Sequence, residues 1–164
     1  MFIAKNNDLI ILANNSRTEL ERQLQFMVYT SIEETQEDYE FINGKYVTST
    51  EASELREQEF LKDFFKVEGF GYYRRQPKGY QSAVESMNVL FNIANVSQGI
   101  QEGLIIFYQE PDFTKPEECT EEWLIEHQII MPAMTLQEFM QLYVAFMTAW
   151  NTEEHVSEVE NDTI

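Results

Sequence analysis

Apolar and polar positions at the start of the chain predict a β-hairpin followed by a helix. The runs "MFIAK" and "DLIILA" flank Asn6 and Asn7, and asparagine tolerates the positive φ that tight turns require. Ser16 is a preferred N-cap residue, and Glu19 occupies the reciprocal position of a capping box. The helix that begins there is predicted to reach about Ser31. Its apolar stripe consists of Leu20, Leu24, Met27 and Val28.

A second hairpin is predicted in the segment "DYEFINGKYVT". Asn43 and Gly44 separate two runs that are rich in β-forming residues. Asn-Gly is the preferred pair for a type I′ turn, because both central residues of that turn adopt positive φ. Residues 1–48 are therefore expected to form a ββαββ unit, in which one helix packs on a small antiparallel sheet.

The pattern from residue 49 onward predicts mostly helices. The segment "STEASELREQEFLKDFF" has few apolar positions and many charges, which indicates an exposed linker helix over residues 49–66. Gly and Pro are dense between Phe64 and Tyr80, so this stretch is predicted to be a loop. Helical spacing resumes in "YQSAVESMNVLFNIANV", and the short apolar run "LIIFYQE" is typical of a strand. A short helix is predicted to begin at Thr120.

The last predicted helix, "TLQEFMQLYVAFMTAW", is more apolar than an ordinary surface helix. Thr135 and Glu138 form a second capping-box pair at its start. A helix of this kind is either central to the core or buried at a subunit interface. The residues that would bind a partner or a second copy in the latter case are Phe139, Tyr143, Phe146 and Trp150.

These elements together predict an α+β protein. Residues 1–48 are expected to form the ββαββ unit and residues 49–66 the linker helix. Residues 67–152 are expected to form a mainly helical unit with one short strand or hairpin. Residues 153–164 are predicted to be an acidic, disordered tail.

Composition and charge narrow the kinds of partner. Of 164 residues, 43% are apolar and 13% aromatic, which is the composition of a folded chain. The net charge is −18, and the stretch from Pro116 to Ile164 contains eleven Asp or Glu but no Lys or Arg. This charge disfavours nucleic acids and anionic membranes as direct partners, and no apolar run has the length of a transmembrane helix. The acidic surface is expected to be mainly solvated, with mimicry of a nucleic acid as the alternative.

Candidate catalytic, cofactor and metal sites are sparse. Cys119 is the only cysteine, so no internal disulfide is expected, and its spacing from His127 fits no zinc motif. Acidic neighbours disfavour the thiolate that a Cys119–His127 nucleophile–base pair would need. No P-loop, Gly-x-Ser-x-Gly or dinucleotide motif is present, and the paired carboxylates are interpreted as solvated charge. We therefore expect a non-enzymatic protein without a cofactor or metal. The N-terminus lacks the pattern of a signal peptide, which predicts synthesis in the cytoplasm.

One segment stands out from the acidic background. The stretch "FFKVEGFGYYRRQPKGY" carries four of the eleven basic residues of the chain. Its candidate partner-binding residues are Tyr72, Tyr73, Arg74, Arg75 and Tyr80. They suit stacking on bases and binding of phosphate. They also suit a hinge between two units, held by carboxylates of the C-terminal half, or a docking segment for a protein. The excess of carboxylates favours the hinge.

The same residues carry a resemblance to a known class of proteins. The opening "MFIAK…LIILA…RTELE", a charged helix and then "FFKVEGFGYYRR" resemble small proteins from the tail region of phages and prophages of Gram-positive bacteria, over residues 1–80. The end "MTLQEFMQLYVAFMTAWNTEEH" is more distantly similar to the helical end of proteins encoded next to tail fibres. Their Thr-x-x-Glu-Phe helix start is matched by Thr135, Glu138 and Phe139. The acidic second half departs from this pattern.

The resemblance implies a virion tail or baseplate component, or a fibre-assembly factor. Such a protein has no catalytic residues and acts through protein–protein contacts. Self-association through the last helix is expected from the apolar character of that helix. The protein would be made in the cytoplasm of the host bacterium and be carried in the virion tail. The alternative, suggested by the acidic second half, is a phage-encoded inhibitor of a host defence nuclease that imitates nucleic acid.

Overall fold

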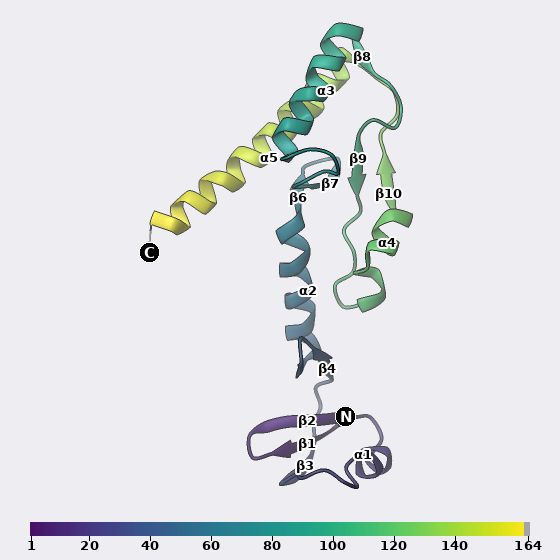
Figure 1. Cartoon of the computed structure of the whole chain (residues 1–164), viewed down its shortest axis with the longest axis vertical. Coiled ribbons are helices and arrows are strands. Elements are labelled where there is room, and N and C mark those ends of the chain that lie inside the picture. Colours follow the sequence, from purple (N-terminus) through teal and green to yellow (C-terminus); the bar gives the residue numbers. More distant parts are fainter. Residues whose placement is uncertain (163–164) are drawn as a thin grey trace. The chain divides into compact units, whose positions relative to one another are not determined.

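The computed structural model describes the backbone of residues 1–162 and the side chains of residues 1–153. The chain divides into two compact units, Met1–Glu57 and Gln58–Ile164, and the boundary falls inside α2. Figure 1 labels the elements. In chain order they are β1 (Phe2–Asn6), β2 (Leu9–Asn14), α1 (Arg17–Gln23), β3 (Ser31–Glu34), β4 (Tyr39–Ile42), β5 (Lys45–Thr48), α2 (Ser49–Asp63), β6 (Phe64–Val67), β7 (Gly71–Arg74), α3 (Ala83–Ser97), β8 (Gly99–Ile100), β9 (Ile106–Tyr108), the 3-10 helix η1 (Pro116–Glu118), α4 (Glu121–Glu126), β10 (Gln128–Ile130), β11 (Met134–Thr135) and α5 (Leu136–Asp162).

The first unit contains a three-stranded antiparallel sheet in the order β2-β1-β3, on which α1 packs. The side chains of Ala4, Leu20 and Leu24 form its buried core. The predicted N-cap is confirmed, because the Ser16 hydroxyl accepts a hydrogen bond from the Glu19 amide at 3.2 Å. The reciprocal half of the predicted capping box does not form, since the Ser16 amide donates to the Asn14 side chain and the Glu19 carboxylate accepts from Arg22. The first predicted hairpin is also confirmed as β1 and β2.

The prediction that α1 continues to Ser31 is wrong. The helix ends at Gln23, and β3 begins at Ser31 and pairs with β1. The Thr30 amide donates to the Lys5 carbonyl at 2.7 Å, so the backbone here completes the sheet. Met27 and Val28, which the helical spacing places on the buried stripe, are exposed instead.

The second predicted hairpin is confirmed as β4 and β5, which form a separate two-stranded sheet. Its turn residues Asn43 and Gly44 have φ values of 53° and 81°, as a type I′ turn requires. Helix α2 begins directly after β5. Near its middle, Arg56 forms an ion pair with Glu40 of β4 at 3.2 Å, which ties the hairpin to the helix.

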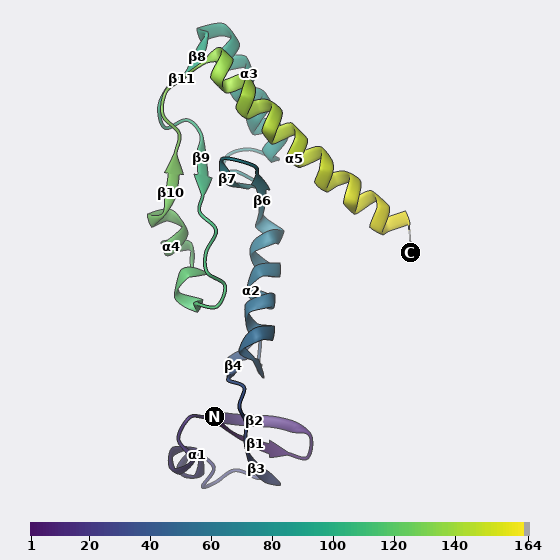
Figure 2. The ribbon, with the colours of Figure 1, turned by 180° about the vertical axis from the view of Figure 1, so that it is seen from behind.

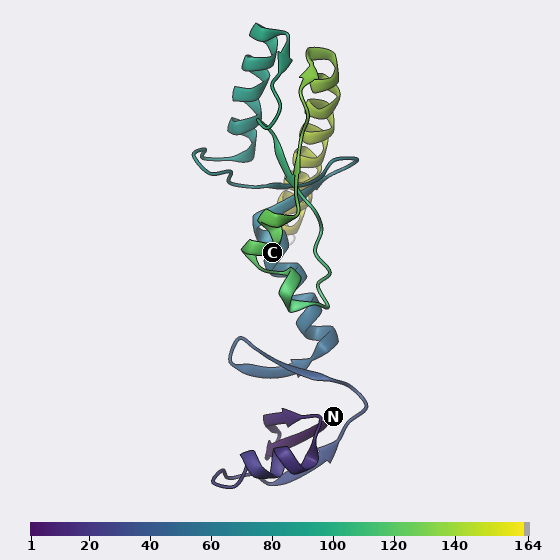
Figure 3. The same cartoon turned by 90° about the vertical axis from the view of Figure 1, so that its right-hand side faces the viewer.

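The second unit has three layers around a four-stranded antiparallel sheet in the order β10-β9-β7-β6. Helices α3 and α5 lie side by side on one face, as Figures 1 and 2 show from opposite sides and Figure 3 shows from a third direction. Phe65, Tyr73 and Phe107 of the sheet meet Phe139 and Phe146 of α5 in the main core. The end of α2 and α4 supply Phe60 and Leu124 to a smaller cluster with Phe64 and Tyr72 of β6 and β7.

The segment predicted to be a loop and a hinge between units is a β-hairpin inside the second unit. Strands β6 and β7 pair in register from Phe64 with Arg74 to Val67 with Gly71. Gly69 and Gly71 do not break the strands, because they form the turn and the start of β7. Gly71 has φ 121°, and a Cβ there would lie 3.1 Å from the Tyr108 carbonyl oxygen. The glycine therefore permits β7 to approach β9.

The predicted α+β class is confirmed, with more strands in the second unit than the single strand or hairpin that the sequence predicts. The two-stranded ladder of β8 and β11 joins the end of α3 to the start of α5, as Figure 3 shows from the side. The second capping box is confirmed: the Glu138 amide donates to the Thr135 hydroxyl at 3.2 Å, and the Thr135 amide donates to the Glu138 carboxylate at 3.1 Å.

The C-terminal end of the chain differs from the predicted disordered tail at residues 153–164. Helix α5 continues through Asp162, and residues 163–164 lie outside the described residues. Over residues 1–162, no helix combines the length and the hydropathy needed to cross a lipid bilayer.

Candidate functional site

The two arginines of the predicted partner-binding segment face different parts of the second unit, and each pairs with a glutamate. Arg74 donates from Nη2 to the Glu121 carboxylate at 2.7 Å. Arg75 donates from Nη1 to Glu153 at 2.8 Å and makes a second, parallel bond to the same carboxylate. Its Nε also donates to the Leu61 carbonyl at 3.1 Å. The predicted pairing with carboxylates of the C-terminal half is confirmed.

The tyrosines of this segment divide between core and surface. Tyr72 and Tyr73 are buried on opposite faces of the sheet, so neither ring is accessible for stacking on a base. Tyr80 lies on the loop after β7 and is 42% exposed. Of the predicted residues on the last helix, Phe139 and Phe146 are completely buried in the core, while Tyr143 and Trp150 are partly buried. Phe139 and Phe146 therefore do not present a surface to a partner.

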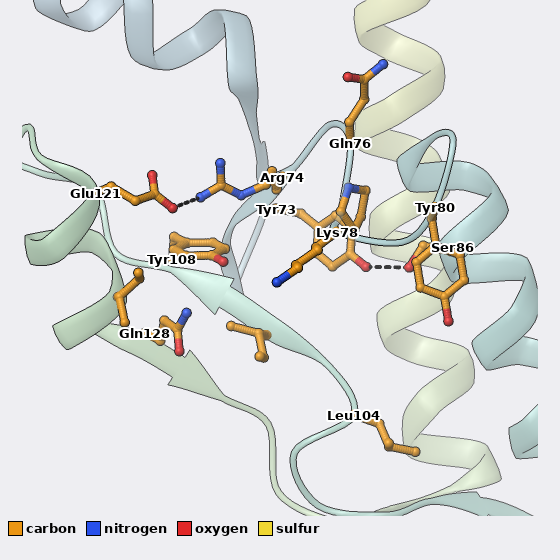
Figure 4. A pocket seen from close by; sticks show the side chains of 13 residues that line it. Tyr73, Arg74, Gln76, Lys78, Tyr80, Ser86, Leu104, Tyr108, Glu121 and Gln128 are labelled. Atoms are coloured by element: carbon orange, nitrogen blue, oxygen red, sulfur yellow. Dashed lines mark hydrogen bonds and ion pairs between the residues drawn. The ribbon is translucent and has the colours of Figure 1, made fainter.

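A pocket of about 560 Å³ lies between the sheet and the loop that follows β7, and Figure 4 shows the side chains that line it. Ile106, Tyr108 and Gln128 of β9 and β10 form one wall. The loop forms the opposite wall with Gln76, Pro77, Lys78 and Tyr80. The volume lies in the range of natural small-ligand sites. The remaining lining residues are Tyr73, Arg74, Ser86, Leu104, Glu121 and Ile125.

Two interactions between lining residues position the walls of the pocket. At one end, the Arg74–Glu121 pair links β7 to α4, and the guanidinium lies 4.6 Å from the centre of the Phe64 ring and 5.2 Å from that of Tyr108. Such stacking orients the guanidinium. At the floor, the hydroxyls of Tyr73 and Ser86 are 3.0 Å apart, and their hydrogen bond is buried. Burial raises the pKa of Tyr73, with the hydrogen bond to Ser86 opposing it, so the phenol stays neutral.

Lys78 differs from almost every other basic residue of the chain in its ion pairing. The other basic residues except Lys45 form ion pairs with carboxylates. Within the part of the chain that the structure describes, Lys78 has none, although the net charge is −18. Figure 4 shows its side chain extending from the loop toward the space between Tyr73 and Tyr108.

Exposed apolar side chains surround the mouth of the pocket. Leu104 is 45% and Ile125 is 53% exposed, and both line it together with Tyr80. Figure 4 places Leu104 at the end opposite the Arg74–Glu121 pair. Apolar groups, tyrosines and a stacked arginine are the composition of the energetic centres of protein interfaces.

Sequence reasoning found part of this site and missed the rest. Arg74, Tyr73 and Tyr80 were expected as partner-binding residues, and all three line the pocket. The contributions of β9, α4 and β10 were not expected. Alternation in "LIIFYQE" was the available signal, since Phe107 is buried while Ile106 and Tyr108 on either side of it line the pocket.

The residues considered for other chemistry lie elsewhere in the unit. The Cys119 thiol contacts backbone carbonyls, and the His127 ring stacks on Trp123 at 4.1 Å between centroids. Across the described residues, no group of three His, Cys, Asp or Glu side chains is arranged to hold a metal ion.

Comparison with known proteins gives no relative: no family model, curated protein or solved structure matches the chain.

Proposed function

We propose that this chain is a non-enzymatic phage or prophage protein that docks a partner protein, as a tail or baseplate component or a fibre-assembly factor. The observation that carries the docking role is the open pocket between β9, β10 and the loop after β7. It combines exposed Leu104, Ile125 and Tyr80 with a preorganised Arg74. Tyr and Arg in such a setting are frequent hot-spot residues. The phage assignment is supported by the resemblance of residues 1–80 and of the last helix to tail-region proteins.

The proposed setting follows from the same resemblance. The protein would be made in the cytoplasm of the host bacterium and then join the virion tail, or leave it once a fibre is assembled. Its partners would be proteins, with neither nucleic acid nor a membrane bound directly, as the charge of −18 favours.

Self-association through α5 is part of the proposal in a restricted form. Phe139 and Phe146 belong to the core, so a contact between copies has to use the residues that α5 exposes. Met140 and Val144, one helical turn apart, are 37% and 60% exposed. Sedimentation velocity of the wild type and of a Met140→Glu/Val144→Glu variant tests this. Self-association predicts a larger species that the variant loses, and a single monomer for both proteins contradicts it.

Co-sedimentation tests the tail assignment. Virions and free tails of the encoding phage are separated on a density gradient, and the protein is followed by immunoblotting. A tail component is expected to migrate with tails and whole virions. An assembly factor is expected to migrate with immature tails only. Recovery of the protein only in the free form, with no protein in the fractions that contain tails or virions, would contradict both forms of the proposal.

A second candidate function is inhibition of a host defence nuclease by an acidic surface that imitates nucleic acid. One observation favours it. Exposed carboxylates follow one another through η1 and α4, at Glu117, Glu121, Glu122 and Glu126. A basic groove would bind such a surface mainly by charge, so the affinity should fall steeply with added salt. Binding to a nuclease that survives replacement of these glutamates by glutamine would overturn this candidate.

A further inference from the structure

Arg74 and Lys78 together give the pocket a local positive charge in a strongly acidic chain. Arg74 uses Nη2 for Glu121, and among the described residues its Nε and Nη1 have no hydrogen-bond acceptor. Lys78 contributes an ammonium group without a carboxylate partner in the same part of the structure. With Glu121 included, the three charged side chains leave the pocket with one net positive charge. A single carboxylate balances this charge, whereas a phosphate dianion would leave the occupied pocket with one net negative charge.

The wall opposite Lys78 is mainly apolar, with Gln128 as its polar side chain. Ile106 and the ring of Tyr108 lie on β9, and Ile125 and Leu104 continue the apolar lining on either side. A ligand that fills the pocket therefore needs a carboxylate and a large apolar group a few bonds apart. Burying such a group against the sheet would supply much of the binding free energy.

The geometry of a peptide chain decides which protein segment satisfies this requirement. In an extended internal segment, neighbouring side chains point to opposite sides, so an acidic residue and the apolar residue next to it do not enter one pocket together. A C-terminal residue carries its carboxylate and its side chain on the same Cα atom. The structure thus assigns a specific occupant to the pocket: we propose that it binds the C-terminal residue of a partner protein, with the free carboxylate between Lys78 and Arg74 and a large apolar side chain against Ile106 and Tyr108.

This inference rests on the proposed docking function and adds the chemistry of the partner. It also predicts a weak dependence on salt, because the local attraction to Lys78 and the long-range repulsion from the acidic chain are both screened. The nuclease-inhibitor candidate, in contrast, requires a steep loss of affinity with salt.

The test uses N-acetyl-phenylalanine as the probe and N-acetyl-phenylalaninamide as its uncharged match. Both are titrated into the ¹⁵N-labelled full chain, and backbone amide signals are followed by NMR. The acid is expected to shift signals of residues 76–80 and 104–108, and the amide to bind roughly tenfold more weakly, because it loses a charge-assisted contact. N-acetylglycine, which lacks the apolar group, is expected to bind more weakly still. Equal binding of acid and amide would overturn the proposal.

Two lysine variants make the test specific. Lys78→Gln is expected to weaken binding of N-acetyl-phenylalanine roughly fivefold or more. Lys45, in β5 of the first unit, is the other lysine that has no ion-pair partner among the described residues. Lys45→Gln is expected to leave binding unchanged. Unchanged binding by the Lys78 variant would overturn the assignment.

Two peptides test whether the bound carboxylate is a chain terminus or a glutamate side chain. A peptide that ends in a free Phe carboxylate is compared with an amidated peptide that contains an internal Phe-Glu pair. Tighter binding of the first supports the C-terminal assignment, and equal or tighter binding of the second overturns it. Tail co-sedimentation is a separate readout: its failure removes the tail function whatever the probes show, while a failure of the probes alone removes only the partner chemistry.

Discussion

Arg75 and Glu153, 78 residues apart in the chain, form a two-pronged ion pair that links the end of β7 to α5. The Arg75 guanidinium also donates a hydrogen bond to the Leu61 carbonyl and lies 5.7 Å from the centre of the Phe65 ring. Both charged side chains are about one-quarter to one-third exposed, at 26% and 34%. This arrangement fixes the hairpin of β6 and β7 to the last helix.

Arg75→Gln is expected to lower the free energy of unfolding by about 1–2 kcal/mol, because it removes a partly buried charge-assisted pair and leaves Glu153 without its partner. Urea unfolding measures the change. Lys66→Gln is the matched control on the same hairpin, since its pair with Glu68 is exposed and 3.8 Å long. Comparable effects of the two substitutions would show that the Arg75 pair has no special structural weight.

Tyr73 should make stability depend on pH in the alkaline range. Burial raises its pKa in the folded state above the ordinary value of 10.0. Below pH 10 the phenol is neutral in both the folded and the unfolded state, so its contribution is fully present. As the pH rises through 10 toward the folded-state pKa, the unfolded chain releases the proton first, and stability falls.

Tyr73→Phe is therefore expected to flatten the decline in the free energy of unfolding between about pH 9 and pH 11. At neutral pH the same substitution should cost about 1–2 kcal/mol, because the buried Ser86 hydroxyl loses its partner. Tyr29→Phe is the control, since the Tyr29 side chain is 43% exposed and is not among the groups that shift the pKa of Tyr73. A slope that Tyr73→Phe leaves unchanged would contradict this origin of the pH dependence.

Gly71 and Gly69 allow a test of why β7 can reach β9. Both have positive φ, at 121° and 85°, so alanine is strained at either position. Only at Gly71 would a Cβ meet other atoms, 3.1 Å from the Tyr108 carbonyl oxygen and 3.3 Å from Ile129. Gly71→Ala is expected to destabilise the chain by about 1–3 kcal/mol more than Gly69→Ala, through steric conflict added to backbone strain. Thermal unfolding of the two variants measures the difference, and equal losses would exclude the steric contribution.

Phe146 and Val144 separate the core side of α5 from its exposed side. Phe146→Ala should cost about 3–5 kcal/mol, since the ring is fully buried against Phe65 and Tyr73. Val144→Ala, at a side chain that is 60% exposed, should change stability by less than about 0.5 kcal/mol. Chemical unfolding at low protein concentration measures both. A large loss from Val144→Ala under these conditions would indicate that α5 packs differently.

The sequence predicts correctly those features that depend on residues a few positions apart. The Asn43-Gly44 turn and the Thr135–Glu138 capping box depend on residues within a few positions of one another, and both occur. The extent of α1 did not follow from such signals. Its helical spacing suits continuation through Val28, but the backbone from Thr30 onward pairs with β1, a contact between distant residues that no local pattern encodes.

The hairpin of β6 and β7 was missed for a related reason. The density of glycine at Gly69 and Gly71 predicts a loop, although glycine also occurs in hairpin turns and where two strands approach closely. The pairing of Arg74 and Arg75 with C-terminal carboxylates followed from charge balance alone. The sequence does not identify the paired glutamates or the pocket that Arg74 helps to form. Both depend on how α4 and α5 pack against the hairpin.

Site-specific photo-crosslinking from the pocket tests the central claim most directly. A benzoylphenylalanine residue is placed at Leu104 on the pocket rim, which is 45% exposed. The control position is Val96 on α3, which is 86% exposed and lies outside the pocket. Cells producing the encoding phage are irradiated, and crosslinked proteins are identified by mass spectrometry. The proposal predicts a crosslink from position 104, absent from position 96, to one tail, baseplate or fibre protein, through a peptide at the partner's C-terminus. A crosslink from position 104 to a host nuclease, or the same products from both positions, would contradict it.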